Sequence, residues 1–154
     1  GIWRAADLLS GAQNRFIIRD AKGKALYEAN FGPGMLGHNL CIPARSNRTM
    51  REMAVADLNG DGAMEFAVTH ANGSIYILNE KAEVLKLYNL FTLVRSLATD
   101  GKVFYAGLTD GRILKIDLNG VRTINRIKGD IYLLKVLDNG HLLAGSSTGD
   151  LFLF

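Results

Sequence analysis

The chain has 154 residues, of which 48% are hydrophobic and 21% charged, the balance of one globular domain rather than of a disordered segment. The formal net charge of +3 is too small to indicate a nucleic-acid-binding protein. The sequence contains no apolar run of the length that a membrane-spanning helix needs. Cys41 is the only cysteine, so an internal disulfide is excluded. Because Gly1 is not preceded by an initiator methionine or followed by a signal-like apolar core, we expect a mature or cut end there.

Glycine-containing turns divide the chain into short segments. There are 17 glycines and only 2 prolines, and 8 of the glycines follow Asn, Asp or Thr. The pairs Asn72-Gly73 and Asp110-Gly111 predict type I′ or related hairpin turns, in which the glycine has a positive φ. The runs between such turns are short and rich in β-branched residues, which favours strands. Only Arg4–Leu9 has mild helical character, so we expect an all-β chain of antiparallel hairpins.

The hairpins repeat at a fixed period. Gly73, Gly111 and Gly149 are separated by equal intervals of 38 residues, and the segments after them, SIYIL, RILKI and DLFLF, are similar. A related copy begins at Asn14, 59 residues before Gly73, which equals one period plus a 21-residue insertion. A period of about 40 residues with four short strands per unit is typical of a β-propeller blade.

The repeat predicts one propeller segment of four-stranded antiparallel blades. Its parts are a partial blade 1 at 4–30, an insertion at 31–51, blade 2 at 52–90, blade 3 at 91–128 and a partial blade 4 at 129–154. Blade 1 is expected to lack its innermost strand and blade 4 its outermost strand. The predicted strands of the last three blades are Met53–Asp57, Glu65–His70, Ser74–Asn79, Glu83–Asn89, Leu93–Thr99, Val103–Leu108, Arg112–Asp117, Val121–Ile127, Ile131–Leu137, His141–Ser146 and Asp150–Phe154.

A partial propeller leaves sheet faces open. A closed ring needs at least four blades, so we expect an open arc in which Ile113, Leu151 and Leu153 lack cover. Exposed sheet faces and unpaired strand edges promote association. We therefore predict that the chain is not a stable free monomer. Either it is a fragment of a longer propeller, or other blades, other copies or another protein chain complete the ring.

Three segments resemble the repeat of quinoprotein-like (PQQ) propellers, namely Arg15–Glu28, Ile75–Tyr88 and Ile113–Ile124. That resemblance implies a tryptophan on the fourth strand that docks neighbouring blades, whereas here Tyr27 or Tyr88 stands at such positions. The quinone-binding enzymes also have a tryptophan floor and, in many members, an adjacent cysteine pair. This sequence has neither, so the resemblance does not extend to the quinone cofactor.

The segment Ala54–Leu78 contains an acidic loop followed by a strand, and it resembles an FG-GAP (VCBS-type) repeat of integrin-like propellers. The chemistry of the loop points to calcium, which prefers six to eight oxygen ligands. The alternating side chains of a tight loop would supply most of these oxygens, and a backbone carbonyl and the next strand would supply the rest. The predicted calcium ligands are Asp57, Asn59, Asp61, the Ala63 carbonyl and Glu65. The alternative is an acidic turn that binds no metal.

The insertion is the predicted interaction loop, because long loops on a rigid scaffold tend to carry function. A loop that only covers a blade edge is the alternative. Asn47 and Asn72 begin sequons and are candidate glycosylation sites. The candidate interaction residues are Phe31, Met35, Leu36, His38, Arg45, Arg48 and Arg51.

Three functional hypotheses follow. The first is a non-enzymatic, calcium-stabilised propeller module, extracellular, at the cell surface or periplasmic, that binds protein or glycan or builds an assembly. The second is part of a propeller enzyme, such as a polysaccharide lyase or a quinoprotein-like dehydrogenase, with most of its active site in other blades. An enzyme needs acid, base and binding groups in one pocket, and the sequence offers no such set. The third, an intracellular WD-repeat-like hub, is disfavoured because cytosolic calcium is too low for a weak site.

Overall fold

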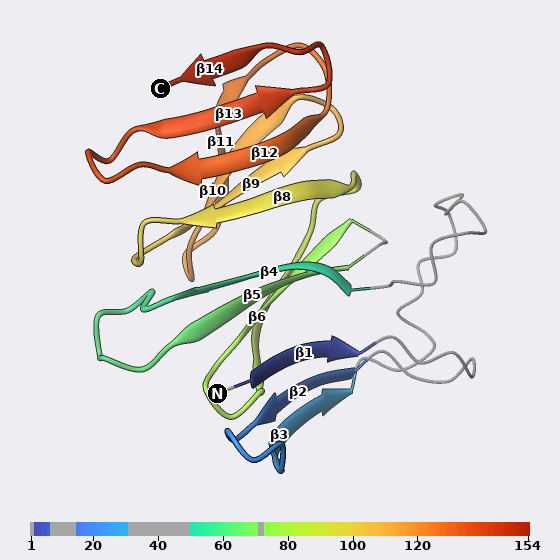
Figure 1. Ribbon diagram of the computed structural model, residues 1–154, viewed down its shortest axis with the longest axis vertical. Coiled ribbons are helices and arrows are strands. Elements are labelled where there is room, and N and C mark those ends of the chain that lie inside the picture. Colours follow the sequence, from blue (N-terminus) through green and yellow to red (C-terminus); the bar gives the residue numbers. More distant parts are fainter. Residues whose placement is uncertain (1, 7–14, 31–49, 71–72) are drawn as a thin grey trace, which may run out of the picture.

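A computed structural model describes residues 2–6, 15–30, 50–70 and 73–154 of the protein. These residues form antiparallel strands arranged in four sheets, which are stacked along the longest axis of the molecule (Figure 1). Among them we find no helix with the length and apolar character that a membrane crossing requires. The predicted all-β class and the partial propeller of four-stranded blades are confirmed, since the four sheets form an open arc.

Each sheet consists of consecutive strands in chain order. The first sheet contains β1 (Ile2–Ala6), β2 (Arg15–Arg19) and β3 (Ala25–Asn30). The second contains β4 (Met50–Ala56), β5 (Glu65–His70), β6 (Ser74–Leu78) and β7 (Val84–Asn89). The third contains β8 (Val94–Thr99), β9 (Phe104–Leu108), β10 (Arg112–Ile116) and β11 (Val121–Arg126). The fourth contains β12 (Ile131–Val136), β13 (Leu142–Ser146) and β14 (Leu151–Leu153).

The first strands of the later sheets lie side by side. β8 contacts both β4 and β12, and the later strands of each sheet lie progressively farther from this inner row, as in a propeller blade (Figure 1). The second and third sheets have four strands each, whereas the first and fourth have three. Among the described residues, the fourth sheet thus has no counterpart of β7 and β11.

The helical character assigned to Arg4–Leu9 is wrong for the part that the structure describes. Ile2–Ala6 is a strand, and it pairs with β2 through the whole of its length, with Arg4 opposite Ile17. A weak local helix preference is overridden when a segment can complete the hydrogen bonds of a neighbouring strand.

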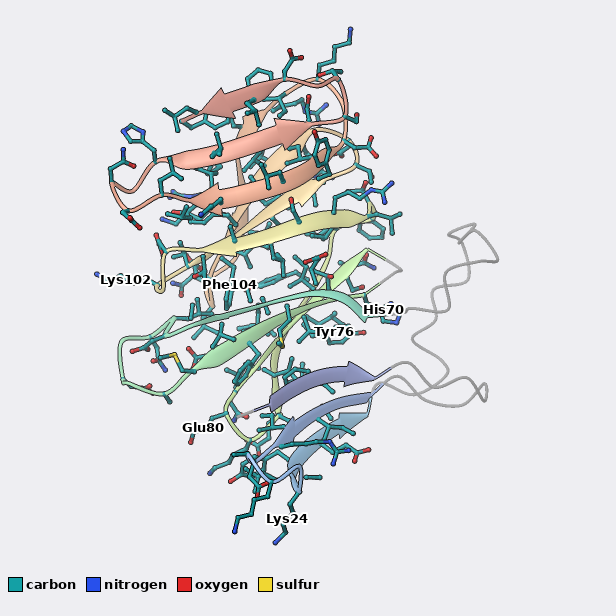
Figure 2. The ribbon with its side chains drawn as sticks, viewed as in Figure 1. Lys24, His70, Tyr76, Glu80, Lys102 and Phe104 are labelled. Atoms are coloured by element: carbon teal, nitrogen blue, oxygen red, sulfur yellow. The ribbon has the colours of Figure 1, made fainter. Side chains whose placement is uncertain are left out.

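The core lies between successive sheets and consists of three layers. Phe16 of the first sheet packs on Phe66 of the second, with ring centroids 5.6 Å apart. Figure 2 shows Tyr76 beside His70 at one end of this layer, and the two rings meet edge-on. Ile75 and Phe104 belong to the layer between the second and third sheets.

One expectation from the sequence is wrong in the third layer, which lies between the third and fourth sheets. Ile113 was expected to lack cover, but it is fully buried, because it packs with Ile131 and Leu134 of the fourth sheet. Alternate residues of a strand face opposite sides of its sheet. Ile113 therefore faces the fourth sheet, while its neighbour Leu114 faces the second.

The repeated glycines close equivalent hairpins. The amides of Gly73, Gly111 and Gly149 donate hydrogen bonds to the carbonyls three residues earlier, at 3.0, 3.2 and 3.0 Å. Their φ angles are +83°, +81° and +89°, which confirms the predicted positive φ. In the Asp110-Gly111 pair only the glycine has a positive φ. The turn is therefore not type I′, which needs two such residues, and it matches the longer hairpin loop closed by a left-handed glycine.

Candidate functional site

The fourth sheet has an open apolar face. Leu151 occupies the position, one period on, that Ile75 and Ile113 hold in the preceding sheets; both isoleucines are 0% exposed, whereas Leu151 is 67% exposed. Leu153 is 60% exposed and pairs with Leu143 across the sheet. The lack of cover predicted for Leu151 and Leu153 is confirmed. We call this surface, made by Leu133, Leu143, Gly145, Leu151 and Leu153, the open face.

The edge of the fourth sheet is open as well. β6 and β10 each pair with a strand on both sides, whereas among the described residues β14 pairs with β13 alone. The strand that returns beside β6 donates a hydrogen bond from Leu90 N to the Gly73 carbonyl at 2.9 Å. The strand beside β10 repeats this bond from Ile127 N to the Gly111 carbonyl, also at 2.9 Å. The two equivalent bonds define where a strand beside β14 would run.

The glycines of these turns are needed because the returning backbone passes very close. A Cβ atom on Gly73 would lie 2.6 Å from the Thr92 carbonyl oxygen, and one on Gly111 would lie 2.0 Å from that of Ile127. Among the described residues, nothing lies within 4 Å of the corresponding point on Gly149. The space that the backbone fills in two sheets is therefore present and open in the fourth.

A second glycine position shows how the next sheet docks. A Cβ on Gly107 would lie 2.5 Å from Ile131 Cγ2, so the first residue of β12 rests directly on this glycine. Ser96 fixes the contact from the other side, since its hydroxyl donates to the Ile131 carbonyl at 3.0 Å. Gly145 is the counterpart of Gly107 one period on, and its nearest neighbours, Leu133 and Leu151, belong to its own sheet.

The acidic loop between β4 and β5 is held by hydrogen bonds within the loop. The two carboxylate oxygens of Asp57 accept from Gly60 N at 2.7 Å and Gly62 N at 3.0 Å. Asn59 Oδ1 accepts from Asp61 N at 3.0 Å, and Asp61 Oδ1 accepts from Ala63 N at 2.7 Å. These are side-chain turns of the kind that Asp and Asn form readily.

Glu65 differs from the other predicted ligands because it is buried. Its side chain is 3% exposed, and Oε2 accepts a hydrogen bond from Leu58 N at 2.7 Å. Nearby in the loop, the side-chain amide of Asn59 donates to Asp61 Oδ2 at 2.9 Å. Among the described residues, no group of three or more His, Cys, Asp or Glu side chains converges as a metal would require. The loop has the oxygen donors that calcium prefers, and in this arrangement those of Asp57, Asn59 and Asp61 accept hydrogen bonds from loop amides.

Tyr88 connects two neighbouring sheets. Its hydroxyl donates to the carbonyl of Asp117, in the turn after β10, at 2.8 Å. Burial, and then the nearby Asp117 carboxylate, raise the pKa of Tyr88. Tyr88 stands at a position where the PQQ-type repeat implies a tryptophan that docks neighbouring blades. Tyr27, at another such position, is 43% exposed.

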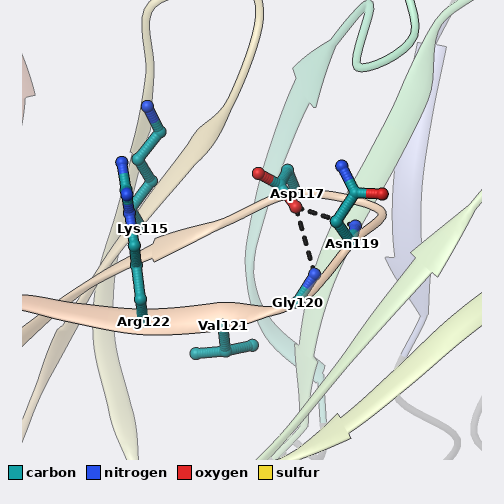
Figure 3. A pocket seen from close by; sticks show the side chains of 6 residues that line it. All are labelled: Lys115, Asp117, Asn119, Gly120, Val121 and Arg122. Atoms are coloured by element: carbon teal, nitrogen blue, oxygen red, sulfur yellow. Dashed lines mark hydrogen bonds between the residues drawn. The ribbon is translucent and has the colours of Figure 1, made fainter.

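A shallow pocket of about 290 Å³ lies at the hairpin between β10 and β11. Figure 3 shows the Asp117 carboxylate accepting from the amides of Asn119 and Gly120, at 2.7 and 3.1 Å. Lys115 and Arg122 lie directly opposite each other across the two strands. Because the only carboxylate here already caps the turn, we assign no ligand to this pocket.

Several predicted site residues lie outside the described residues. They include both sequon asparagines, Asn47 and Asn72, and most of the predicted interaction loop, Phe31, Met35, Leu36, His38, Arg45 and Arg48. Arg51 belongs to β4. Leu133 and Gly145 were not among the predicted site residues. The repeated Ala-Gly pairs at 106–107 and 144–145, one period apart, carry the signal that could have found Gly145.

No protein-family model matches the sequence, and no curated protein matches it either. Solved structures do resemble it. The chain is similar to BBS1N from its complex with ARL6DN, with a TM-score of 0.65, 14% identity, and coverage of 91% of this chain and 43% of that one. It is also similar to the Dos1 propeller, with a TM-score of 0.65, 11% identity, and coverage of 92% and 35%.

A third similar structure is the WD40 β-propeller domain of Doa1, with a TM-score of 0.59, 17% identity, and coverage of 96% of this chain and 51% of that one. At these identities the likeness concerns the fold alone. The fold is that of a β-propeller. The chain spans less than half the length of the BBS1N and Dos1 chains.

Proposed function

We propose that this chain is a non-enzymatic β-propeller module that assembles with protein through the fourth sheet. The observation that carries this proposal is the open face, where Leu151 and Leu153 are at least 60% exposed. Ile75 and Ile113, the counterparts of Leu151, are buried between sheets. Contiguous apolar surface of this kind marks interaction sites on soluble proteins, and an unpaired strand edge adds hydrogen-bonding groups to it.

Light scattering across a range of protein concentrations tests the proposal. We expect species heavier than the 16.8 kDa monomer, because the open face is covered when chains associate. The double variant Leu151→Asp, Leu153→Asp should be monomeric. The matched control is the double variant Val84→Asp, Leu87→Asp on β7. It places two aspartates at exposed apolar positions of another sheet, where Val84 is 48% and Leu87 49% exposed. A wild-type protein that is monomeric at every concentration and melts cooperatively would refute the proposal.

Calcium binding at the acidic loop is a further part of the proposal. It is supported by the donor set of Asp57, Asn59, Asp61 and Glu65, and binding would exchange their hydrogen bonds to the loop for metal ligation. Extracellular modules bind calcium with dissociation constants of roughly 10⁻⁴–10⁻³ M. At the tight end of that range, about 1–2 mM calcium would add roughly 1.4–1.8 kcal/mol of stability. The proposed extracellular, cell-surface or periplasmic setting depends on this site.

Thermal melts with calcium and with a chelator test the site. We expect a higher melting temperature with calcium for the wild type and no difference for Asp61→Ala. Asp20→Ala is a matched control, because Asp20 also caps a turn, by accepting from Lys22 N and Lys24 N, but lies in another sheet. Equal melts of the wild type in the two solutions would show that the loop is a metal-free turn.

Glycan recognition and enzymatic activity are the remaining alternatives. A propeller enzyme would need catalytic groups gathered in one pocket, and a glycan-binding site would need polar groups beside an exposed aromatic ring. The open face is instead aliphatic, which favours contact with protein. Binding of a glycan array without any protein association would favour the glycan hypothesis.

A further inference from the structure

Two loops of the protein contain the same four residues, Asp-Leu-Asn-Gly, at 57–60 and at 117–120. An Asn-Gly pair is chemically labile, because glycine has no side chain to keep its backbone nitrogen away from the asparagine amide. We propose that Asn119 is a site of spontaneous deamidation and that the fold protects Asn59 from the same reaction. This difference in reactivity does not depend on the proposed function.

Deamidation consumes one water molecule and releases ammonia. The backbone nitrogen of Gly120 loses its proton and attacks the side-chain carbonyl carbon of Asn119, so that a carbon–nitrogen bond forms and the amide nitrogen leaves as ammonia. Water then adds to one of the two carbonyl carbons of the resulting succinimide ring and opens it. Opening at the side-chain carbonyl gives aspartate, and opening at the backbone carbonyl gives isoaspartate. Either product carries a carboxylate, which lowers the formal net charge of +3 by one.

The side chain of Asn119 is free to rotate towards the backbone nitrogen that follows it. Its backbone amide donates to Asp117 Oδ1 at 2.7 Å, but nothing in the part of the chain that the structure describes forms a hydrogen bond with its side-chain amide. Asn59 is held at both side-chain atoms, because Oδ1 accepts from Asp61 N at 3.0 Å and Nδ2 donates to Asp61 Oδ2 at 2.9 Å. These two bonds resist the rotation that the reaction needs.

The attacking nitrogen is also held more loosely at Gly120. Gly120 N donates to Asp117 Oδ1 at 3.1 Å, and that oxygen also accepts the shorter bond from Asn119 N at 2.7 Å (Figure 3). Gly60 N donates to Asp57 Oδ1 at 2.7 Å. The nitrogen must give up its hydrogen bond before it attacks, so the longer, shared bond makes Gly120 N the more available nucleophile.

The charges around the two loops favour reaction at the same site. Loss of the amide proton leaves a negative charge, which nearby cations stabilise and nearby carboxylates oppose. Lys115 and Arg122 line the pocket that contains Asn119. The loop at 57–65 instead carries three carboxylates and no lysine or arginine. Electrostatics therefore add to the difference that the hydrogen bonds create.

The position of Asn119 is open to water wherever it occurs in the repeat. Asn119 is exposed. Lys81 holds the same turn position one period earlier, where its backbone nitrogen donates to Asn79 Oδ1 at 2.9 Å. Lys81 is exposed as well, although the third sheet packs behind its own sheet. The packing of a following sheet therefore leaves this position accessible, and water can reach the ring that forms there.

Peptide mapping by mass spectrometry measures the reaction at both sites, since replacement of the amide NH₂ by OH changes the mass of the peptide. The protein is incubated at neutral pH with a chelator, so that calcium does not hold the loop at 57–65. In the folded protein we expect Asn119 to react at least about fivefold faster than Asn59, because each hydrogen bond that must break adds to the activation barrier. In urea the two identical tetrapeptides should react at rates within about twofold of each other.

Two variants test the cause of the difference. A Cβ on Gly120 would meet nothing within 4 Å among the described residues, and φ there is outside the left-handed region, so Gly120→Ala should keep the stability of the wild type. Its methyl group hinders the attacking nitrogen, and deamidation of Asn119 should slow by about tenfold or more while Asn59 is unchanged. Asp61→Ala removes the acceptor of Asn59 Nδ2 and should accelerate reaction at Asn59 by about threefold or more.

Three results would overturn the inference. Equal rates at the two sites in the folded protein, or a faster reaction at Asn59, would show that the hydrogen bonds do not control reactivity. A wild-type rate at Asn119 in a folded Gly120→Ala variant would exclude attack by the Gly120 nitrogen. Folding that slows Asn119 as strongly as Asn59, relative to the rates in urea, would show that the turn at 117–120 is protective too.

Discussion

Substitutions at the repeated turn glycines can distinguish two contributions to a loss of stability, namely backbone strain and steric overlap. Gly111 and Gly149 have nearly the same φ, +81° and +89°, so alanine at either position costs roughly 1–2 kcal/mol for a left-handed conformation. Only at Gly111 does the new Cβ meet another atom, the Ile127 carbonyl oxygen at 2.0 Å. The backbone there must move, which breaks the 2.9 Å hydrogen bond from Ile127 N to the Gly111 carbonyl.

The lost hydrogen bond leaves a buried group unpaired and costs about 1–3 kcal/mol more. Gly111→Ala should therefore destabilise the protein by about 2–5 kcal/mol in total, and Gly149→Ala by about 1–2 kcal/mol. Urea unfolding followed by circular dichroism measures both changes. In thermal melts of a chain of this size, each kcal/mol should lower the melting temperature by roughly 2–4 °C.

Gly73→Ala serves as a second copy of the test, because its Cβ would lie 2.6 Å from the Thr92 carbonyl oxygen. It should behave like Gly111→Ala. If Gly111→Ala and Gly149→Ala destabilise the protein equally, the returning backbone does not pass over Gly111 as described. The equivalence of the three hairpins, on which the reasoning about the fourth sheet depends, would then be wrong.

Three further predictions concern individual contacts. Tyr88→Phe should lower stability by about 0.5–1.5 kcal/mol, since it removes the hydroxyl that donates to the Asp117 carbonyl; an unchanged urea midpoint would contradict the bond. Ser96→Ala should cost about 1–3 kcal/mol, because it leaves the buried carbonyl of Ile131 without this donor, and the urea midpoint again measures it. Burial alone would raise the pKa of Asp100, but hydrogen bonds from two backbone amides and from the Tyr105 hydroxyl outweigh it and hold that pKa below its ordinary value. The stability that Asp100 provides is therefore present above about pH 4 and is lost as the pH falls through the lowered pKa. Asp100→Asn should be less stable than the wild type at pH 7, and the difference should shrink towards pH 3; a difference that does not change with pH would refute this.

Most of the architecture could be predicted from the sequence because turn residues recur at the period of the repeat. Gly73, Gly111 and Gly149 have to adopt a conformation that other residues avoid, so their spacing is visible without any structure. The strands between them were placed to within a few residues for the same reason. The exception is Arg4–Leu9, where the pairing of Ile2–Ala6 with β2 decided the conformation, and no local pattern records such pairing.

The candidate site was less predictable, because exposure depends on which sheet lies next to which. Ile113 and Leu151 occupy equivalent positions in the repeat, yet one is buried and the other is 67% exposed. From the sequence, both residues were expected to lack cover. The repeat period shows which positions are equivalent, but it does not show on which side a neighbouring sheet packs.

For the acidic loop, the residue types were informative but the geometry was not predictable. Its residue types indicate oxygen donors, but whether Asp57 and Asp61 turn to a metal or to loop amides depends on geometry.

The stacking of sheets also determines how the protein should open. Within the described residues, each core cluster joins one sheet to the next, so the stability of a sheet is close to a sum of nearest-neighbour terms, as in repeat proteins. In the part of the chain that the structure describes, the second and third sheets are covered on both faces, whereas the fourth is covered on one. Amide hydrogen exchange should therefore be slowest in β5, β6, β9 and β10 and fastest in β14. The same gradient means that the last sheet can fray, and release or accept a neighbour, without unfolding the sheets behind it.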